Sequence, residues 1–151
     1  APIRIEDEIK QQNFPDEFMK ASLNILLTAD RISHATNSAL KPFGISKEQF
    51  NVLRILRGQS PNPASLQLVC ERMISKTSNA TRLVEKLRQK GLVERQQCDT
   101  DRRQIDIRIT DSGMKLLKEL DPLVKKSGEQ MRKLNEKEAK ELNRLLDKMR
   151  S

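Results

Sequence analysis

A change of hydrophobic period between residues 66 and 110 constrains the fold of this chain more than any other feature. Two short segments carry apolar residues at helical spacing, at positions 66, 69, 70 and 73 and then at positions 80, 83, 84 and 87. After Gly91 the pattern becomes a strict alternation, which places Ile105, Ile107 and Ile109 on one face of a strand. The sequence therefore predicts two short helices followed by a β-hairpin.

The two predicted helices have the arrangement of a helix-turn-helix. The turn is expected at residues 73–75, and the second helix is expected to run from about residue 76 to residue 89. The hairpin pairs residues 92–95 with residues 105–110, and its tip, residues 96–103, is polar and rich in charge. A hairpin with a charged tip beside a helix-turn-helix is a wing.

Two helices are predicted before this region. A long amphipathic helix spans Glu17–Leu40, and a shorter one spans Ser46–Arg57 and stops at Gly58. Ser46 stands three residues before Gln49, the spacing at which the two side chains cap each other's backbone N–H groups. The start of the shorter helix is therefore well defined by the sequence.

Two more helices are predicted after the wing. The first begins just after Thr110, with a bend expected at Pro122, and the last opens at Asn135, whose capping partner is Glu138. Only 36% of the 151 residues are apolar and 33% are charged, which leaves little core for such long terminal helices to cover. We therefore expect these helices to pair with those of a second copy of the chain.

These patterns predict one domain over residues 1–151, of the size usual for a single compact unit. The predicted fold class is mainly α with a small β-hairpin wing (α+β). Residues 45–110 are expected to form a winged helix-turn-helix lobe. Residues 1–44 and 111–151 are expected to form the dimerisation helices.

The distribution of charge predicts a polyanionic partner. The chain has a net charge of +8, and the segment from Arg72 to Arg108 holds ten Lys and Arg against five Asp and Glu, so about a quarter of the chain carries +5 of that charge. Short hydroxyl and amide side chains between cations suit contact with base edges and phosphates, although a solvated helix face explains the same residues. The candidate DNA contacts in and before the second helix are Ser75, Lys76, Thr77, Ser78, Asn79, Thr81, Arg82 and Lys86.

Three stretches of the sequence carry a resemblance to a known family. They are Thr81–Leu87, Lys90–Arg95 and Asp101–Gly113, the last with an Asp-x-Arg before the alternating strand and a Thr-x-x-Gly after it. With these motifs the chain resembles the multiple-antibiotic-resistance regulator (MarR) family over about residues 16–149. The resemblance implies a homodimeric transcription regulator that binds a pseudo-palindromic operator on double-stranded DNA. It also implies a repressor that a small aromatic or anionic effector, or an oxidant, releases from the operator, with no cofactor. The chain has only two cysteines, which predicts reduced thiols and a cytoplasmic protein.

The resemblance also assigns roles to individual residues. Asp101 would hold the wing through a salt bridge, and Arg103 would reach the minor groove. Arg102 would lie on a phosphate or support Arg103, and residues 76–82 would face the major groove.

The turn of the helix-turn-helix departs from the family's pattern. Ile74 stands where many relatives have Gly. The sequence therefore leaves open which of Ser75, Lys76 and Thr77 begins the reading surface.

Three further residues are candidates for other roles. His34, on the long first helix, is either an ordinary helix or interface residue or an effector contact. Cys70 takes an inward position of the third predicted helix and is interpreted as core packing. Cys98 lies near wing cations that lower a thiol pKa, so a redox-sensing regulator is an alternative hypothesis.

Several classes of protein find no support in the sequence. No cluster has metal-ligand spacing, no phosphate loop or G-x-S-x-G motif is present, and the single His has no catalytic partner beside it, so neither a metal site nor an enzyme is expected. No stretch is apolar enough to cross a membrane, and the acidic start does not resemble an export signal. The main alternative function is a winged-helix module that binds another protein instead of DNA.

Overall fold

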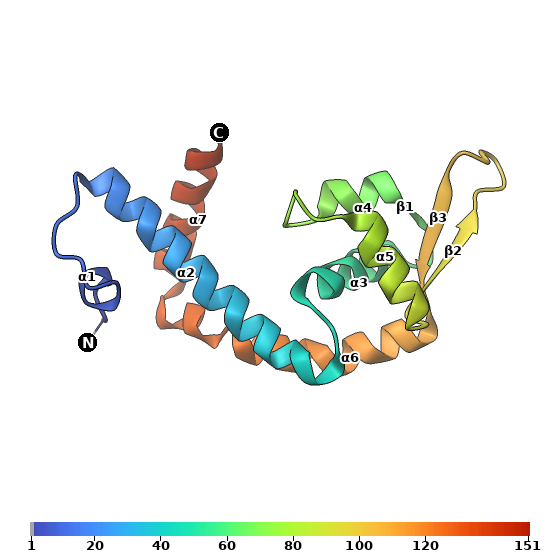
Figure 1. The fold of residues 1–151 in the computed structure, drawn as a ribbon, viewed down its shortest axis with the longest axis horizontal. Coiled ribbons are helices and arrows are strands. Elements are labelled where there is room, and N and C mark those ends of the chain that lie inside the picture. The colour runs from blue at the N-terminus through green and yellow to red at the C-terminus, as the bar shows by residue number, and fades with distance from the viewer. Residues whose placement is uncertain (1) are drawn as a thin grey trace.

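A computed structural model describes residues 2–151 of the chain. Figure 1 shows two regions joined by a long helix. One region is a lobe made of α3 (Lys47–Gln59), α4 (Leu66–Arg72), α5 (Ala80–Gln89) and a small sheet. The other region contains α1 (Ile5–Glu8), α7 (Glu136–Arg150) and most of α2 (Glu17–Leu40). Helix α6 (Asp111–Ser127) runs beneath both regions. The short 3-10 helices η1 (Lys41–Phe43) and η2 (Glu129–Lys133) connect α2 to α3 and α6 to α7. The predicted mainly helical fold with a wing is confirmed.

Helix α3 begins as the sequence predicts. The Ser46 hydroxyl accepts the Gln49 N–H and the Gln49 side chain accepts the Ser46 N–H, both at 3.1 Å. The helix ends two residues later than expected, at Gln59. Glycine lowers helix stability without ending a helix, whereas Pro61 forces the residue before it out of the helical region, so the proline and not Gly58 sets the end.

The second helix of the helix-turn-helix starts later than predicted. Helix α5 begins at Ala80 and not at residue 76, because the Asn79 side chain accepts the Arg82 N–H at 3.1 Å and so caps the helix. Residues 73–79 form a loop between α4 and α5, called the reading loop below. The predicted contacts from Ser75 to Asn79 therefore lie on a loop and not on a helix.

The orientation of α4 also differs from the prediction. Cys70 is exposed, while Val69 is buried and Leu68 packs against the core. Val69 is the buried residue at the middle of the inward face of α4, and Leu66 and Leu68 pack against the core on either side of Val69. In this orientation of the helix, Cys70 lies outside the buried face. The interpretation of Cys70 as a core thiol is wrong.

The sheet has three antiparallel strands in the order β1-β3-β2, with β1 at Ala64–Ser65, β2 at Val93–Gln97 and β3 at Ile105–Ile109. Strands β2 and β3 form the predicted wing, in the register Val93 to Ile109 and Gln97 to Ile105. Strand β1 was not predicted, since a pair of residues shows no alternation.

The base of the wing explains the Thr-x-x-Gly motif. The Thr110 hydroxyl donates to the Gly91 carbonyl at 2.7 Å and accepts the Gly113 N–H at 3.1 Å, so it caps α6 and closes the hairpin at once. A Cβ on Gly113 would lie 2.3 Å from the Leu92 carbonyl oxygen. Only glycine fits at this position.

The hydrophobic core lies in the lobe and along α6. Most of its largest fully buried side chains belong to α3, α5, β3 and α6, among them Leu53, Leu87, Ile107 and Leu117, and Leu40 at the end of α2 joins them. A bidentate pair between Arg57 and Asp121, at 2.6 and 3.2 Å, also joins α3 to α6. The long helix α6 is thereby fixed to the DNA-binding lobe predicted from the sequence.

The terminal helices contribute little to this core. In α2 only Leu40 is buried, and α7 has no buried residue. The short helix α1 was not predicted. It is anchored by Ile5 and by Glu6, whose nearly buried carboxylate lies 2.5 Å from Lys20 Nζ on α2 and 3.2 Å from the Arg4 guanidinium. None of the helices within residues 2–151 is both long and apolar enough to span a bilayer.

Candidate nucleic-acid interface

Helix α5 separates a buried face from a cationic outer face. Ala80, Val84 and Leu87 are buried against the core, whereas Arg82 and Lys86 lie on the opposite side. Thr81 is exposed as well. The helix therefore presents polar and cationic side chains to solvent while its apolar face holds it on α3 and the sheet.

The reading loop and α5 together line a shallow groove against the start of α3. The groove has a volume of about 550 Å³. Six of the predicted DNA contacts line it, namely Ser75, Thr77, Ser78, Asn79, Arg82 and Lys86. Lys76 and Thr81 lie beside it, and the Lys76 ammonium donates to the Glu71 carbonyl oxygen. The structure thus brings most of the predicted contacts from this region to one surface.

One acidic side chain also lines the groove. Glu48 lies 3.2 Å from the Lys47 ammonium. Burial raises the pKa of Glu48, but hydrogen bonds from its own backbone and from Lys47 outweigh that effect, so its pKa is lowered overall. A fixed negative charge therefore stands among the groove's cations.

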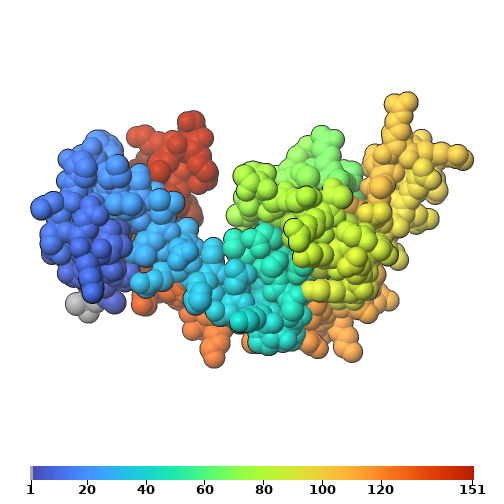
Figure 2. Space-filling view, viewed as in Figure 1, coloured from blue at the N-terminus to red at the C-terminus, as the bar shows by residue number. Residues whose placement is uncertain are grey.

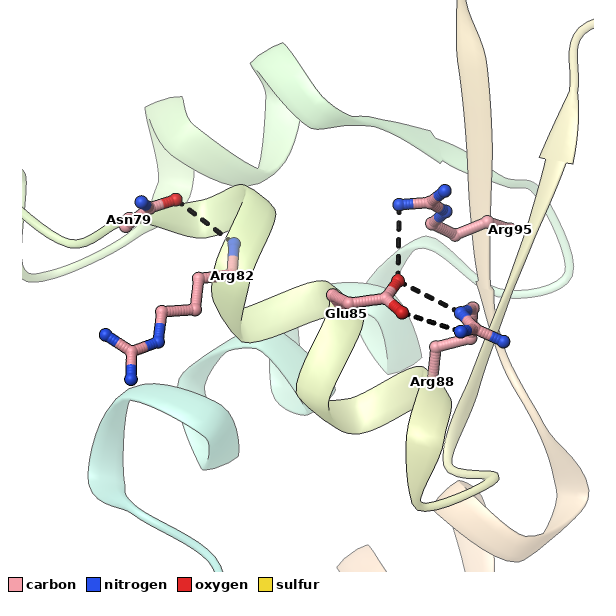
Figure 3. A network of polar contacts seen from close by, with 5 residues as sticks. All are labelled: Asn79, Arg82, Glu85, Arg88 and Arg95. Carbon is pink, nitrogen blue, oxygen red and sulfur yellow. Dashed lines mark hydrogen bonds and ion pairs between the residues drawn. The ribbon is translucent and has the colours of Figure 1, made fainter.

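A network around Glu85 ties α5 to the wing (Figure 3). The Glu85 carboxylate accepts two hydrogen bonds from Arg88, at 2.6 and 3.0 Å, and lies 3.4 Å from Arg95 on β2. The hydrogen bonds from Arg88 lower the pKa of Glu85, and Glu85 raises the pKa of Arg88. Sequence analysis missed this residue, although its i, i+3 spacing to Arg88 is a signal for a helix-surface pair.

The wing projects from the lobe as a separate arm, visible at the upper right of Figure 2. Arg102 and Arg103 are exposed at its tip. The tip is held by backbone hydrogen bonds, from Cys98 N–H to the Gln104 carbonyl at 2.9 Å and from Gln104 N–H to the Asp101 carbonyl at 3.0 Å. The structure therefore places both arginines at the end of a hydrogen-bonded hairpin.

The role predicted for Asp101 needs correction. Within residues 2–151 no salt bridge includes Asp101, and its carboxylate instead accepts the Arg103 backbone N–H at 3.0 Å. An Asp side chain is short and commonly bonds the backbone two residues ahead, which forms a local turn. Asp101 shapes the wing tip through this turn and leaves the Arg103 guanidinium free.

A second cavity lies between α2 and the lobe. It has a volume of about 260 Å³ and is bounded by α2, α3, the reading loop and Val124 of α6. Its lining combines apolar, hydroxyl and cationic side chains with one carboxylate, and includes Ile32, Ser33, Phe50, Arg54 and Glu48. His34, the candidate effector residue, is exposed and does not line this cavity.

The remaining candidates stay isolated. Cys98 is half-buried, with its sulfur 3.3 Å from the Thr100 hydroxyl, and Cys70 is exposed on α4. Residues 2–151 contain no group of three or more His, Cys, Asp or Glu side chains placed to hold a metal ion.

Comparison with known proteins gives consistent results. The family model described as MarR family matches residues 45–105. A MarR transcription factor from Planctomyces limnophilus is 32% identical, with a TM-score of 0.70 over 89% of this chain and 98% of that protein. The transcriptional repressor MprA of Escherichia coli is 26% identical over an alignment that covers 75% of this chain. The same alignment covers only 64% of the length of MprA. A mutant MarR from E. coli, solved in complex with operator DNA, is 22% identical with a TM-score of 0.77 over 91% of this chain and 99% of that chain.

A winged helix-turn-helix with a cationic recognition helix and wing defines a class of transcription regulators. The chain belongs to the MarR family, as the resemblance in its sequence predicts. The relatives compared above are named as a transcription factor and a transcriptional repressor.

Proposed function

We propose that this chain is a homodimeric repressor that binds a pseudo-palindromic operator and leaves it when a small aromatic or anionic effector binds. The observation that carries the proposal is the polar and cationic surface formed by the reading loop and α5, together with the exposed arginines at the tip of the wing. The operator complex of the mutant E. coli MarR supports the DNA-binding role, since this chain shares its fold. The repressor role is supported by the name of MprA, to which most of this chain is similar.

The surface divides the work of binding between two elements. Arg82 and Lys86, with the short polar side chains of the reading loop, face the major groove. Arg103 enters the adjacent minor groove, where narrow A·T-rich stretches concentrate negative potential, and Arg102 lies on a phosphate. Within residues 2–151 none of these four cationic side chains is engaged in an ion pair, so none has to break a salt bridge before it binds DNA.

Dimerisation is supported by the bare apolar stripe on α2. Phe18 is 84% exposed and Leu26 is 66% exposed, about two turns apart on one face of the helix. Met149 on α7 is 62% exposed. A single chain gains nothing by leaving large apolar side chains in water, so residues 1–44 and 111–151 pair with those of a second copy.

The effector site is the 260 Å³ cavity between α2 and α3. Arg54 supplies positive charge at its wall, whereas the charge of Lys47 is paired with Glu48, which lines the cavity too. The Arg54 guanidinium lies 5.9 Å from the centre of the Phe50 ring. This lining suits a flat anion of modest size. A ligand wedged between the dimer helix α2 and the lobe shifts the population of DNA-binding arrangements if it binds them unequally.

The test is selection of bound duplexes from a random DNA pool, with the protein's mass measured in solution in the same buffer. We expect a dimer and an enriched inverted repeat. A well-folded dimer that enriches no sequence would contradict the regulator function and favour a module that binds another protein.

A further inference from the structure

Asn51 connects the wall of the effector cavity to the reading loop. It is a half-buried residue on α3 and lines the cavity beside Phe50 and Arg54. Its side-chain oxygen accepts the backbone N–H of Ile74 at 2.9 Å. Ile74 lines the cavity as well and stands at the start of the reading loop.

Met73, the first residue of the reading loop, is buried in the core, but residues 74–78 have few other anchors. Within residues 2–151 the only hydrogen bonds that tie residues 74–78 to another element are this one and that from the Lys76 ammonium to the Glu71 carbonyl. Inside the loop, Ser78 N–H donates to the Ser75 carbonyl at 3.3 Å. The Ile74 side chain is 82% exposed, so apolar packing does not hold it either. A lysine side chain is long and flexible, whereas the Asn51 bond fixes the backbone itself.

From this placement we propose that Asn51 is a positioning residue for DNA binding, which holds the reading loop in the conformation that presents residues 75–79 to the major groove. The proposal rests on the proposed function for its effect on DNA. The acceptor of this hydrogen bond lies on α3, and α3 is held in the core by its buried residues Phe50, Leu53 and Leu56. Asn51 thus ties the loop to a helix that is packed in the core.

Three variants of the full chain separate positioning from general stability. Asn51→Ala removes the acceptor, and Asn51→Asp keeps an oxygen at the same place. The matched control is Asn37→Ala on α2, because the Asn37 side-chain oxygen likewise accepts a backbone N–H, that of Lys47 at 3.0 Å, without contact to the loop. Circular dichroism and thermal unfolding establish that each variant folds.

The first measurement is the hydrogen-exchange rate of the backbone N–H groups of residues 74–78. Loss of one hydrogen bond corresponds to about three- to tenfold faster exchange. We expect that increase in Asn51→Ala, a rate near that of the wild type in Asn51→Asp, and no change in Asn37→Ala. Unchanged loop exchange in Asn51→Ala, or equal acceleration in Asn37→Ala, would overturn the proposal.

The second measurement is affinity for the selected operator. We expect Asn51→Ala to bind about three- to tenfold more weakly and Asn37→Ala to bind like the wild type. Equal affinity of the wild type, Asn51→Ala and Asn37→Ala would refute the role in DNA binding. If the wild type itself binds no duplex, the proposed function fails, whereas the exchange rates still decide whether Asn51 holds the loop.

Discussion

At the scale of single residues, the cations of the lobe fall into two groups. Arg88 and Arg95 share the Glu85 carboxylate, which compensates one of their two positive charges and joins α5 to β2. Arg102 and Arg103 carry exposed charge at the wing tip, where the Asp101 carboxylate bonds the backbone and not a guanidinium. The contrast separates cations that build the lobe from cations available to DNA, a division that composition alone does not reveal.

The wing-tip arginine gives the first prediction. Arg103→Ala is expected to weaken operator binding about tenfold or more, because it removes the side chain assigned to the minor groove. The fold should be unchanged, since the Arg103 side chain makes no hydrogen bond within residues 2–151 and only its backbone N–H bonds Asp101. Fluorescence anisotropy with the selected duplex measures the effect. The control is Lys118→Ala, which removes one exposed positive charge from α6. An equal loss of operator affinity in both variants would show that Arg103 contributes only its charge and makes no specific contact.

At the scale of secondary-structure elements, the sequence predicted those features that depend on residues close together in the chain. The capping boxes at Ser46 and Asn135 are present, and the alternating isoleucines form β3. The start of α5 was misplaced because residues 76–79 contain no Gly or Pro that would exclude a helix, and only the Asn79 cap marks where the helix begins. The two-residue strand β1 and the Asn51 bond depend on contacts between distant segments, which no local pattern reports.

Two glycines on different elements give a paired prediction of stability. Gly113→Ala should destabilise the fold by about 2 kcal/mol or more, because its Cβ would collide with the Leu92 carbonyl and the Ile109 side chain. Gly58→Ala should stabilise it by about 0.5–1 kcal/mol, since Gly58 is helical and a Cβ there meets nothing within 4 Å. Urea unfolding at one fixed protein concentration measures both. Similar shifts for the two variants would show that the fit at Gly113 does not govern the junction of the wing and α6.

The anchoring of α1 on α2 should depend on pH. The hydrogen bond from the Lys20 ammonium is the largest of the effects that lower the pKa of Glu6 to about 2. A carboxyl whose pKa falls on folding contributes stability that is present above its unfolded value, near 4.5, and is lost as pH falls toward 2. Backbone N–H groups of residues 5–9 should therefore exchange faster, relative to their intrinsic rates, as pH drops through that window. In Glu6→Gln the exchange rates of these N–H groups should no longer depend on pH in this way. If the wild-type protein shows no such pH dependence, the ion pairs of Glu6 do not anchor α1.

At the scale of the whole molecule, a single chain has its core in the lobe and bare apolar side chains on α2 and α7. A small domain that neutralises a few phosphates binds DNA weakly at cellular salt, whereas a two-fold dimer doubles the contacts. Dimerisation and DNA binding are therefore expected to fail together.

The α2 stripe tests that link. Leu26→Glu should give a monomer in sedimentation velocity, because it places a charge in the centre of the apolar stripe, and operator affinity should fall with it. Asn24→Glu, an exposed position on another face of α2, should leave the dimer intact. A Leu26→Glu protein that remains dimeric would place the subunit interface elsewhere.

The central claim is that two copies of the lobe read two half-sites on one face of duplex DNA. Two such lobes meet the duplex about 34–36 Å apart, one helical turn. The most direct test is the affinity for the selected operator compared with the same duplex carrying about half a helical turn of extra base pairs between its half-sites, which turns one half-site to the opposite face. We predict that the insertion reduces affinity to the level of a scrambled duplex at the same salt concentration. Unchanged affinity would contradict the account, because it would mean that the lobes bind independently of the dimer.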